Sequence, residues 1–288
     1  VIYVWIDALT NYITSLGYPD ENSELFKKYW PADLHLVGKE IVRFHAIIWP
    51  ALLMALDLPL PKQVFGHGWL KIDGGKISKS LGNYKDPREY IDKYGVDAVR
   101  YYALREVSFG SDGNFSEEAL IARTNADLAN TLGNLLNRTI AMTNKYFDGV
   151  ISNSKVNEEI DTELINKASN LKSVVDKNME KLYISDALEE IFNFLRECNK
   201  YIDDTTPWVL AKEGKLERLQ TVLYNLLESI RISSVLLTPF MPTTTEKIFK
   251  QLNTNLNTYD TLNEFGALEN NHKLGQIEVL FKRIEIEK

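Results

Sequence analysis

Short apolar segments alternate with helical patterns over the first 70 residues, and no other feature constrains the fold as strongly. Segments 1–7, 33–38 and 63–68 are apolar and rich in β-prone residues, which is typical of strands covered on both faces. Stretches 8–16 and 40–56 between them repeat apolar residues at helical spacing. This order predicts a doubly wound α/β sheet, in which ligands bind beyond the carboxyl ends of the strands.

A loop rich in lysine, serine and glycine follows the third expected strand. Residues 64–72 alternate and then turn at 73–75, a hairpin signal because glycine tolerates positive φ. A lysine can follow phosphate oxygens as they move, and serine hydroxyls and backbone N–H groups add hydrogen bonds to the same anion. The loop is therefore a candidate polyphosphate site, although its composition alone fits a solvated turn better. Its candidate residues are Lys76, Ser78, Lys79 and Ser80.

Aromatic residues recur at helical spacing near the first two expected strands. Tyr12 comes four residues after Ala8, and Trp49 four after His45, so each pair shares a helix face. Trp5 lies within the first expected strand. A thioether is apolar and polarisable and packs well against aromatic edges, so these rings would suit a methionine side chain. Aromatic stripes are also common in hydrophobic cores, and a core role stays open for each residue.

Polar residues at the ends of the second and third expected strands are candidates for nucleotide binding. Gly38 and Glu40 open a helix, where a backbone can approach a ligand closely and a carboxylate can accept from a ribose hydroxyl. Glu40 is equally explained as a first-turn acidic residue favoured by the helix dipole. His67, beside two glycines, is a candidate for shaping the nucleotide site, whereas His35 is expected to be structural.

The pattern changes to long helices near residue 116. Asp86-Pro87 and the pattern over 90–105 predict two short helices, and a turn-rich stretch follows at 108–116. Apolar residues then recur at helical spacing with polar breaks, which predicts an antiparallel helix bundle. The expected helical segments are 116–147, 158–182, 185–203, 215–237 and 243–252.

One face of this bundle carries side chains suited to single-stranded bases. Asn130, Asn134 and Arg138 follow at four-residue steps, and Trp208 comes directly after a proline that starts another helix. Amides can read base edges, arginine can stack or bind phosphate, and tryptophan offers a stacking surface. A solvated helix face and a core tryptophan are the alternative interpretations.

Composition limits the class of protein. With 44% hydrophobic and 25% charged residues the chain is ordinary for a globular protein, and its net charge of −7 argues against a polybasic nucleic-acid coat. The single cysteine, Cys198, can form neither an internal disulfide nor a zinc site alone, which predicts a reducing compartment. No run reaches the roughly 20 apolar residues of a membrane span, and no signal peptide is visible, so we expect a cytoplasmic chain with no membrane partner.

The loop sequence Lys-Ile-Ser-Lys-Ser at 76–80, entered from Gly-His-Gly-Trp at 66–69, resembles the second signature of class I aminoacyl-tRNA synthetases, in the form found in methionyl-tRNA synthetases. Ile77 replaces the usual Met, an apolar exchange that leaves both lysines in place. Other stretches are similar to family segments that line the amino-acid pocket or contact the anticodon. These stretches are 4–12, 38–45, 49–50, 134–138 and 207–212.

The resemblance implies a fold class of α/β followed by all-α. Its parts are the second half of a Rossmann-type catalytic domain at 1–84, a stem-contact connector at 85–115, a helix-bundle anticodon-binding domain at 116–270 and a C-terminal return segment at 271–288.

The resemblance also implies that methionine and ATP, with Mg²⁺, give methionyl-adenylate, and that the methionyl group then moves to tRNA(Met), including the initiator. The implied roles are catalysis by Lys76, Ser78, Lys79 and Ser80; ATP binding by Gly38, Glu40, His67, Leu70 and Lys79; methionine binding by Trp5, Ala8, Leu9, Tyr12, His45 and Trp49; and anticodon binding by Asn130, Asn134, Arg138 and Trp208.

The family's first signature, a histidine-glycine pair that opens the first helix of the nucleotide-binding fold, is missing from the sequence, as is the insertion that carries a zinc knuckle in many members. We therefore expect a C-terminal part of a longer protein that is inactive alone, with any zinc site outside this chain; the oligomeric state is left open. Two alternatives remain. The chain could act only as a tRNA-binding module, or it could come from a related class I enzyme for leucine, isoleucine, valine or cysteine.

Overall fold

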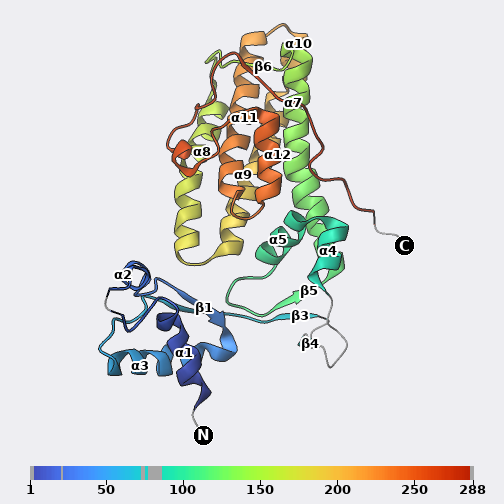
Figure 1. Ribbon diagram of the computed structural model, residues 1–288. Coiled ribbons are helices and arrows are strands. Elements are labelled where there is room, and N and C mark those ends of the chain that lie inside the picture. The colour runs from blue at the N-terminus through green and yellow to red at the C-terminus, as the bar shows by residue number, and fades with distance from the viewer. Residues whose placement is uncertain (1–2, 21, 73–74, 77–85, 286–288) are drawn as a thin grey trace. The chain divides into compact units, whose positions relative to one another are not determined.

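The computed structural model describes residues 3–20, 22–72, 75–76 and 86–285, and the chain divides into two compact units (Figure 1). The first unit comprises Val1–Ile77 together with Phe109–Asn114, and the second comprises Ser78–Ser108 and Phe115–Lys288. The stretch predicted as a single connector, 85–115, is therefore shared between the units, because its turn-rich end packs with the first.

The strands of the first unit form a parallel pair and a small antiparallel sheet. β1 (His35–Gly38) and β2 (Val64–His67) run parallel, and Gly38 is paired with His67. The predicted hairpin is confirmed, since β3 (Leu70–Ile72) pairs with β4 (Gly75–Lys76), and β5 (Gly113–Phe115) lies on the other side of β3.

The expected continuous strand over 64–72 is interrupted between β2 and β3. A Cβ atom on Gly68 would lie 2.0 Å from the carbonyl oxygen of Ser111, so only glycine permits this close approach of two backbones. The next amide, Trp69 N–H, donates to the Asp112 carboxylate at 2.9 Å. Between β2 and β3, the backbone therefore contacts the segment 109–114 and does not continue as a strand.

The prediction of a strand over 1–7 is wrong for residues 4–7, because α1 (Val4–Thr14) already begins at Val4. Leu9 and Ile13 lie four residues apart and are both 1% exposed, and one turn earlier Trp5 stacks on Phe44 with ring centroids 3.9 Å apart. The same apolar run therefore also fits one face of a helix. A helix satisfies its own backbone groups, whereas a strand needs a neighbour, and no described strand pairs with this segment.

The predicted helix over 40–56 is helical but not uniform. A 3₁₀ turn, η1 (Lys39–Ile41), precedes a π-helical stretch, η2 (Phe44–Ile48), and then α3 (Trp49–Ala55). Pro50 lies in the first turn of α3 and has no N–H to donate to the preceding turn, which explains why the regular helix begins only there. The first unit also contains α2 (Glu24–Tyr29).

The second unit is the predicted helix bundle (Figure 1). α8, α9 and α11 pack side by side, and α11 contacts α7 and α12 as well. α11 is the centre of the core, since nearly all of its residues from Arg218 to Leu237 are buried. The elements are α4 (Pro87–Tyr94), α5 (Val96–Arg105), α6 (Glu117–Arg123), the π-helical η4 (Thr124–Gly133), α7 (Asn134–Phe147), β6 (Val150–Ile151), α8 (Glu159–Glu180), α9 (Ile184–Thr205), α10 (Pro207–Lys212), α11 (Leu216–Leu237), α12 (Pro242–Leu252), η5 (Tyr259–Leu262) and β7 (His272–Lys273).

The starts of α4 and α6 follow the capping rules used for prediction. The Asp86 side chain accepts from the Arg88 N–H at the start of α4, with Pro87 in the first turn. Ser116 caps α6 by accepting from the Ala119 N–H. None of the described helices is long and apolar enough to span a bilayer.

Candidate functional site

Four aromatic residues of the predicted methionine site come together in the first unit. The Tyr12 hydroxyl lies 2.9 Å from His45 Nε2, and the Tyr12 and Trp49 ring centroids are 6.0 Å apart. The Trp5 and His45 rings meet edge to face at 6.3 Å. Two residues from α1, one from η2 and one from the start of α3 therefore form a single aromatic cluster.

The polar atoms of this cluster are paired with one another. His45 Nδ1 lies 3.0 Å from the Ile41 carbonyl oxygen, so Nδ1 carries the proton and Nε2 accepts from the Tyr12 hydroxyl. The Trp49 indole N–H donates to His35 Nε2 at 3.1 Å. Both hydrogen bonds require an unprotonated Nε2, so each imidazole serves as an acceptor.

His35, which was expected to be structural, packs within this cluster. Its ring centroid lies 4.5 Å from that of Tyr12 and 5.8 Å from that of His45. No spacing rule connects it with Trp49, because one residue is on β1 and the other on α3.

The remaining two predicted methionine residues, on α1, lie differently. Leu9 is 1% exposed and packs in the hydrophobic cluster with Ile13, Trp49 and Leu53, whereas Ala8 is exposed. Trp49 is itself fully buried. The core role and the pocket role that the sequence left open for Trp49 therefore coincide, since the aromatic cluster forms the edge of the core.

Acidification is expected to weaken this cluster. Burial lowers the pKa of His35, and the neighbouring His45 lowers it further. His35 in the unfolded chain then binds a proton more readily than His35 in the folded chain. Its contribution to the free energy of unfolding is therefore fully present above about pH 6.5 and decreases as the pH drops below that value. Histidine ring-proton NMR, assigned with His35→Asn, should give a midpoint below about 6.5 for His35. A midpoint at or above that value would contradict this environment.

Of the predicted ATP-binding residues that the structure describes, Gly38 and His67 end β1 and β2, Glu40 follows in η1, and Leu70 begins β3. A Cβ atom on Gly38 would be 2.8 Å from Glu40 Oε2, so the glycine leaves room for that carboxylate. Glu40 Oε2 accepts from the Trp69 indole N–H at 2.9 Å. His67 and Leu70 are exposed, and the His67 Nδ1 is bonded to the Gly68 carbonyl at 2.9 Å. These four residues thus share one edge of the first unit.

Three charged residues that the sequence did not single out lie at the same edge. Asp112 Oδ1 is 2.5 Å from Lys39 Nζ, and Asp112 Oδ2 is 2.9 Å from Lys71 Nζ. Hydrogen bonds from Lys39, then from Lys71 and the Trp69 N–H, hold the pKa of Asp112 well below its usual range. Lys39 Nζ also lies 4.3 Å from the centroid of the Trp69 ring.

The lysine loop is described only in part. Lys76 ends the hairpin in β4, with its backbone paired to Lys71. Ser78, Lys79 and Ser80 lie outside the described residues.

The predicted anticodon residues lie on the bundle. Asn130 on η4 and Asn134 at the start of α7 are exposed, and Trp208 on α10 is 45% exposed. Arg138 forms a 3.1 Å ion pair with Asp203, which stands near the end of α9 just before α10. The ion pair therefore brings Arg138 to the end of α9 that precedes α10, the helix carrying Trp208.

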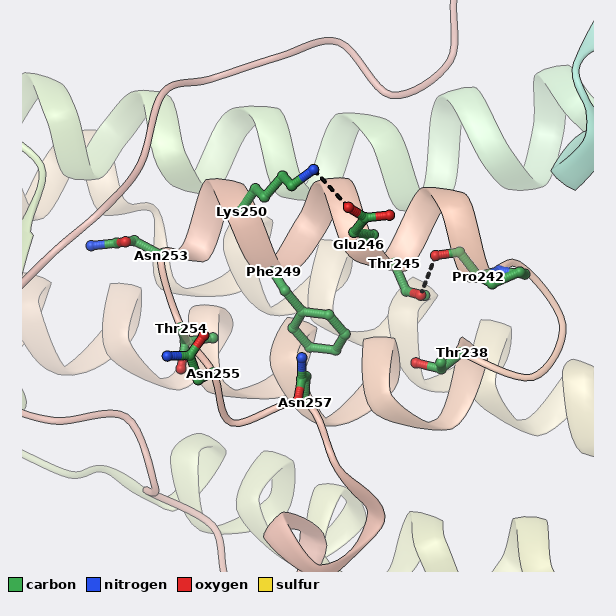
Figure 2. Close-up of a pocket in the computed structure, with 10 residues that line it drawn as sticks. All are labelled: Thr238, Pro242, Thr245, Glu246, Phe249, Lys250, Asn253, Thr254, Asn255 and Asn257. Atoms are coloured by element: carbon green, nitrogen blue, oxygen red, sulfur yellow. Dashed lines mark hydrogen bonds and ion pairs between the residues drawn. The ribbon is translucent and has the colours of Figure 1, made fainter.

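A groove of about 460 Å³ lies elsewhere on the second unit (Figure 2). α12 and the segment 253–257 line it, and Figure 2 shows Phe249 and Asn257 pointing toward each other across it. At its rim, Lys250 and Glu246 are paired at 2.7 Å. None of the predicted site residues lines this groove, so we do not assign it to the candidate sites.

Residues 1–140 match the family model "tRNA synthetases class I (M)", and residues 161–283 match "Anticodon-binding domain of tRNA ligase". The whole chain is 62% identical to a methionine–tRNA ligase of Caldanaerobacter subterraneus subsp. tengcongensis, of which it covers 46%, and 58% identical to one of Clostridium acetobutylicum, of which it covers 45%. A Bacillus subtilis methionine–tRNA ligase is 56% identical and is covered over 44% of its length. The chain thus spans slightly less than half the length of these relatives.

The solved structures agree with these sequence matches. Mycobacterium tuberculosis methionyl-tRNA synthetase in complex with methionyl-adenylate matches 98% of this chain and 56% of its own, with a TM-score of 0.92 and 43% identity. The free form of the same enzyme matches all of this chain with a TM-score of 0.91 and 40% identity.

Proposed function

Because the chain belongs to the methionyl-tRNA synthetase family, we propose that the protein containing it activates L-methionine with ATP and transfers the methionyl group to tRNA(Met) in the cytoplasm. The observation that best supports this is the convergence of Trp5, Tyr12, His45 and Trp49, next to the strand ends that carry Gly38 and Glu40. An aromatic cluster beside a nucleotide-binding edge suits an apolar amino acid that must meet ATP.

The aromatic cluster supports selection of a thioether. The Tyr12 hydroxyl and the Trp49 indole N–H both donate to imidazole nitrogens. Neither of these two hydrogens is therefore available to a ligand. Sulfur packs favourably against aromatic ring edges, which these residues supply. We propose that Trp5, Ala8, Leu9, Tyr12, His45 and Trp49 form the methionine site.

For the nucleotide, we propose that Gly38 admits the ribose and that the Glu40 carboxylate accepts a hydrogen bond from a ribose hydroxyl, while His67 and Leu70 border the base. ATP enters as its Mg²⁺ complex, and Lys76, Ser78, Lys79 and Ser80 stabilise the leaving pyrophosphate as the methionine carboxylate attacks the α-phosphorus. Such a reaction depends on positioning and on stabilising developing charge, and it requires no general base.

The test is methionine-dependent ATP–pyrophosphate exchange by the full-length protein, followed by aminoacylation of tRNA(Met). We expect exchange with methionine to exceed exchange with leucine, isoleucine, valine and cysteine. Equal or better exchange with one of those amino acids would contradict the proposed specificity and favour a related class I enzyme.

We propose that the second unit binds the anticodon of tRNA(Met), including the initiator, through Asn130, Asn134, Arg138 and Trp208. Trp208→Ala should weaken binding of tRNA(Met) about tenfold, because stacking of one base on an aromatic ring contributes about 1–3 kcal/mol. Filter binding with labelled tRNA measures the change.

The matched control for this variant is Tyr183→Ala. Tyr183 is also about half exposed, at 48%, but it lies just before the first residue of α9. Trp208 follows the last residue of this helix, which is about 33 Å long. Equal losses from the two variants would show that Trp208 has no special part in binding.

A second candidate is a tRNA-binding module without catalysis, which the independent core of the second unit favours. Titration of the 288-residue chain with tRNA(Met) carrying normal or altered anticodons separates the two. Anticodon-dependent binding without aminoacylation by the full-length protein supports the module, and binding that ignores the anticodon excludes it.

A further inference from the structure

Asp112 lies at the centre of the polar contacts in the first unit. Its Oδ1 accepts from Lys39 Nζ at 2.5 Å and from the Trp69 backbone N–H at 2.9 Å, and its Oδ2 lies 2.9 Å from Lys71 Nζ. The carboxylate is 26% exposed, so these pairs are shielded more than ordinary surface pairs. One side chain thus joins the helical turn after β1, the link between β2 and β3, and β3 itself.

The segment that carries Asp112 is fixed by its neighbours. Phe109 stacks on Phe65 of β2 with ring centroids 5.1 Å apart and planes within 7°. The Gly113 N–H donates to the Trp69 carbonyl at 2.8 Å, and the backbone at Ser111 fills the space beside Gly68. Asp112 is therefore presented from a rigid position.

The partners of Asp112 lead directly to the proposed ATP site. Lys39 lies between Gly38 and Glu40 in the sequence, and the indole of Trp69 donates to Glu40. Lys71 is paired across the hairpin with Lys76, where the lysine loop begins. Loss of the carboxylate would release two ammonium groups and one backbone donor at the edge where ribose and phosphates are proposed to bind.

We propose that Asp112 is a positioning residue for ATP: it holds Lys39, Trp69 and the β3–β4 hairpin so that Glu40 and the start of the lysine loop are oriented for the nucleotide. This inference rests on the proposed function. Lys39 and Lys71 bring two ammonium groups to this edge, and Asp112 holds each of them in place by a charge-assisted hydrogen bond.

The test uses the full-length protein and measures the KM for ATP and the KM for methionine separately by pyrophosphate exchange. Asp112→Ala should raise the KM for ATP about tenfold and change the KM for methionine less than twofold, since hydrogen bonds to charged groups typically contribute about 1.5–3 kcal/mol. Asp112→Asn retains an acceptor for the Trp69 N–H and should recover part of the ATP affinity.

The matched control is Asp33→Ala. Asp33 also holds a lysine, Lys62, at 2.5 Å and lies in the same unit, but its side chain is 84% exposed and lies before β1. Asp33→Ala removes the same charge as Asp112→Ala, and we expect the KM for ATP and the KM for methionine to stay unchanged.

The outcomes separate this inference from the proposed function. An active wild type with an unchanged KM for ATP in both Asp112 variants would overturn the positioning role. Parallel loss of affinity for ATP and methionine, without recovery in Asp112→Asn, would indicate general damage and also overturn it. A wild type without methionine-dependent exchange would overturn the proposed function, and the positioning role with it.

Discussion

Replacing Glu228 with alanine is expected to lower the free energy of unfolding of the helical unit by about 3–5 kcal/mol. Glu228 and Arg231 are both fully buried on α11, with Glu228 Oε1 and Arg231 Nη2 2.8 Å apart. Glu228 Oε1 also accepts from the N–H groups of Gly266 and Ala267. The substitution would leave a buried guanidinium without its counter-charge and leave the N–H groups of Gly266 and Ala267 without this acceptor.

Urea unfolding followed by far-ultraviolet circular dichroism measures this change, because most of the described helices belong to the second unit. Glu246→Ala is the matched control, since Glu246 and Lys250 form a 2.7 Å pair with side chains 65% and 72% exposed. Removing an exposed pair should cost less than about 1 kcal/mol. A loss of this small size for Glu228→Ala as well would contradict the buried-charge argument.

This ion pair illustrates what the sequence could predict about the fold. Helical periodicity predicted the long helices of the bundle and nearly all of their limits, because one apolar face per helix suffices for that. The spacing of Glu228 and Arg231 is that of an ordinary surface pair. Only the packing of other helices and of the segment near Gly266 around α11 makes both residues part of the core.

The first unit shows the converse difficulty. The run at its start is apolar and β-prone and also places Trp5, Leu9 and Ile13 on one helix face, so periodicity alone could not choose. The presence or absence of a neighbouring strand decides between the two, and that is a property of the tertiary structure.

The candidate site was predictable where its residues are close in the sequence. Tyr12 follows Ala8 by four residues and Trp49 follows His45 by four, so the helix period predicted that each pair shares a helix face. His35 and Asp112 belong to the candidate sites through hydrogen bonds between elements that are distant in the sequence. His35 accepts from Trp49, and Asp112 accepts from Lys39. No local rule selects a partner 73 residues away.

Replacing Trp49 with alanine is expected to destabilise the first unit by about 3–5 kcal/mol and to raise the KM for methionine in the full-length protein at least tenfold. The ring is fully buried against Leu9 and Leu53, so its loss leaves a cavity, and it also removes one wall of the proposed methionine site. Tryptophan fluorescence during urea unfolding measures the stability, because three of the four remaining tryptophans, Trp5, Trp30 and Trp69, belong to this unit.

Trp49→Phe separates packing from hydrogen bonding at this position. The phenyl ring keeps much of the buried volume, but His35 Nε2 loses the indole donor at 3.1 Å, which should cost about 1–3 kcal/mol. Trp208→Ala removes an exposed indole from the other unit and should leave the unfolding of the first unit unchanged. The proposed methionine pocket uses this indole as a wall, so an unchanged KM for methionine in Trp49→Ala would refute the proposed pocket.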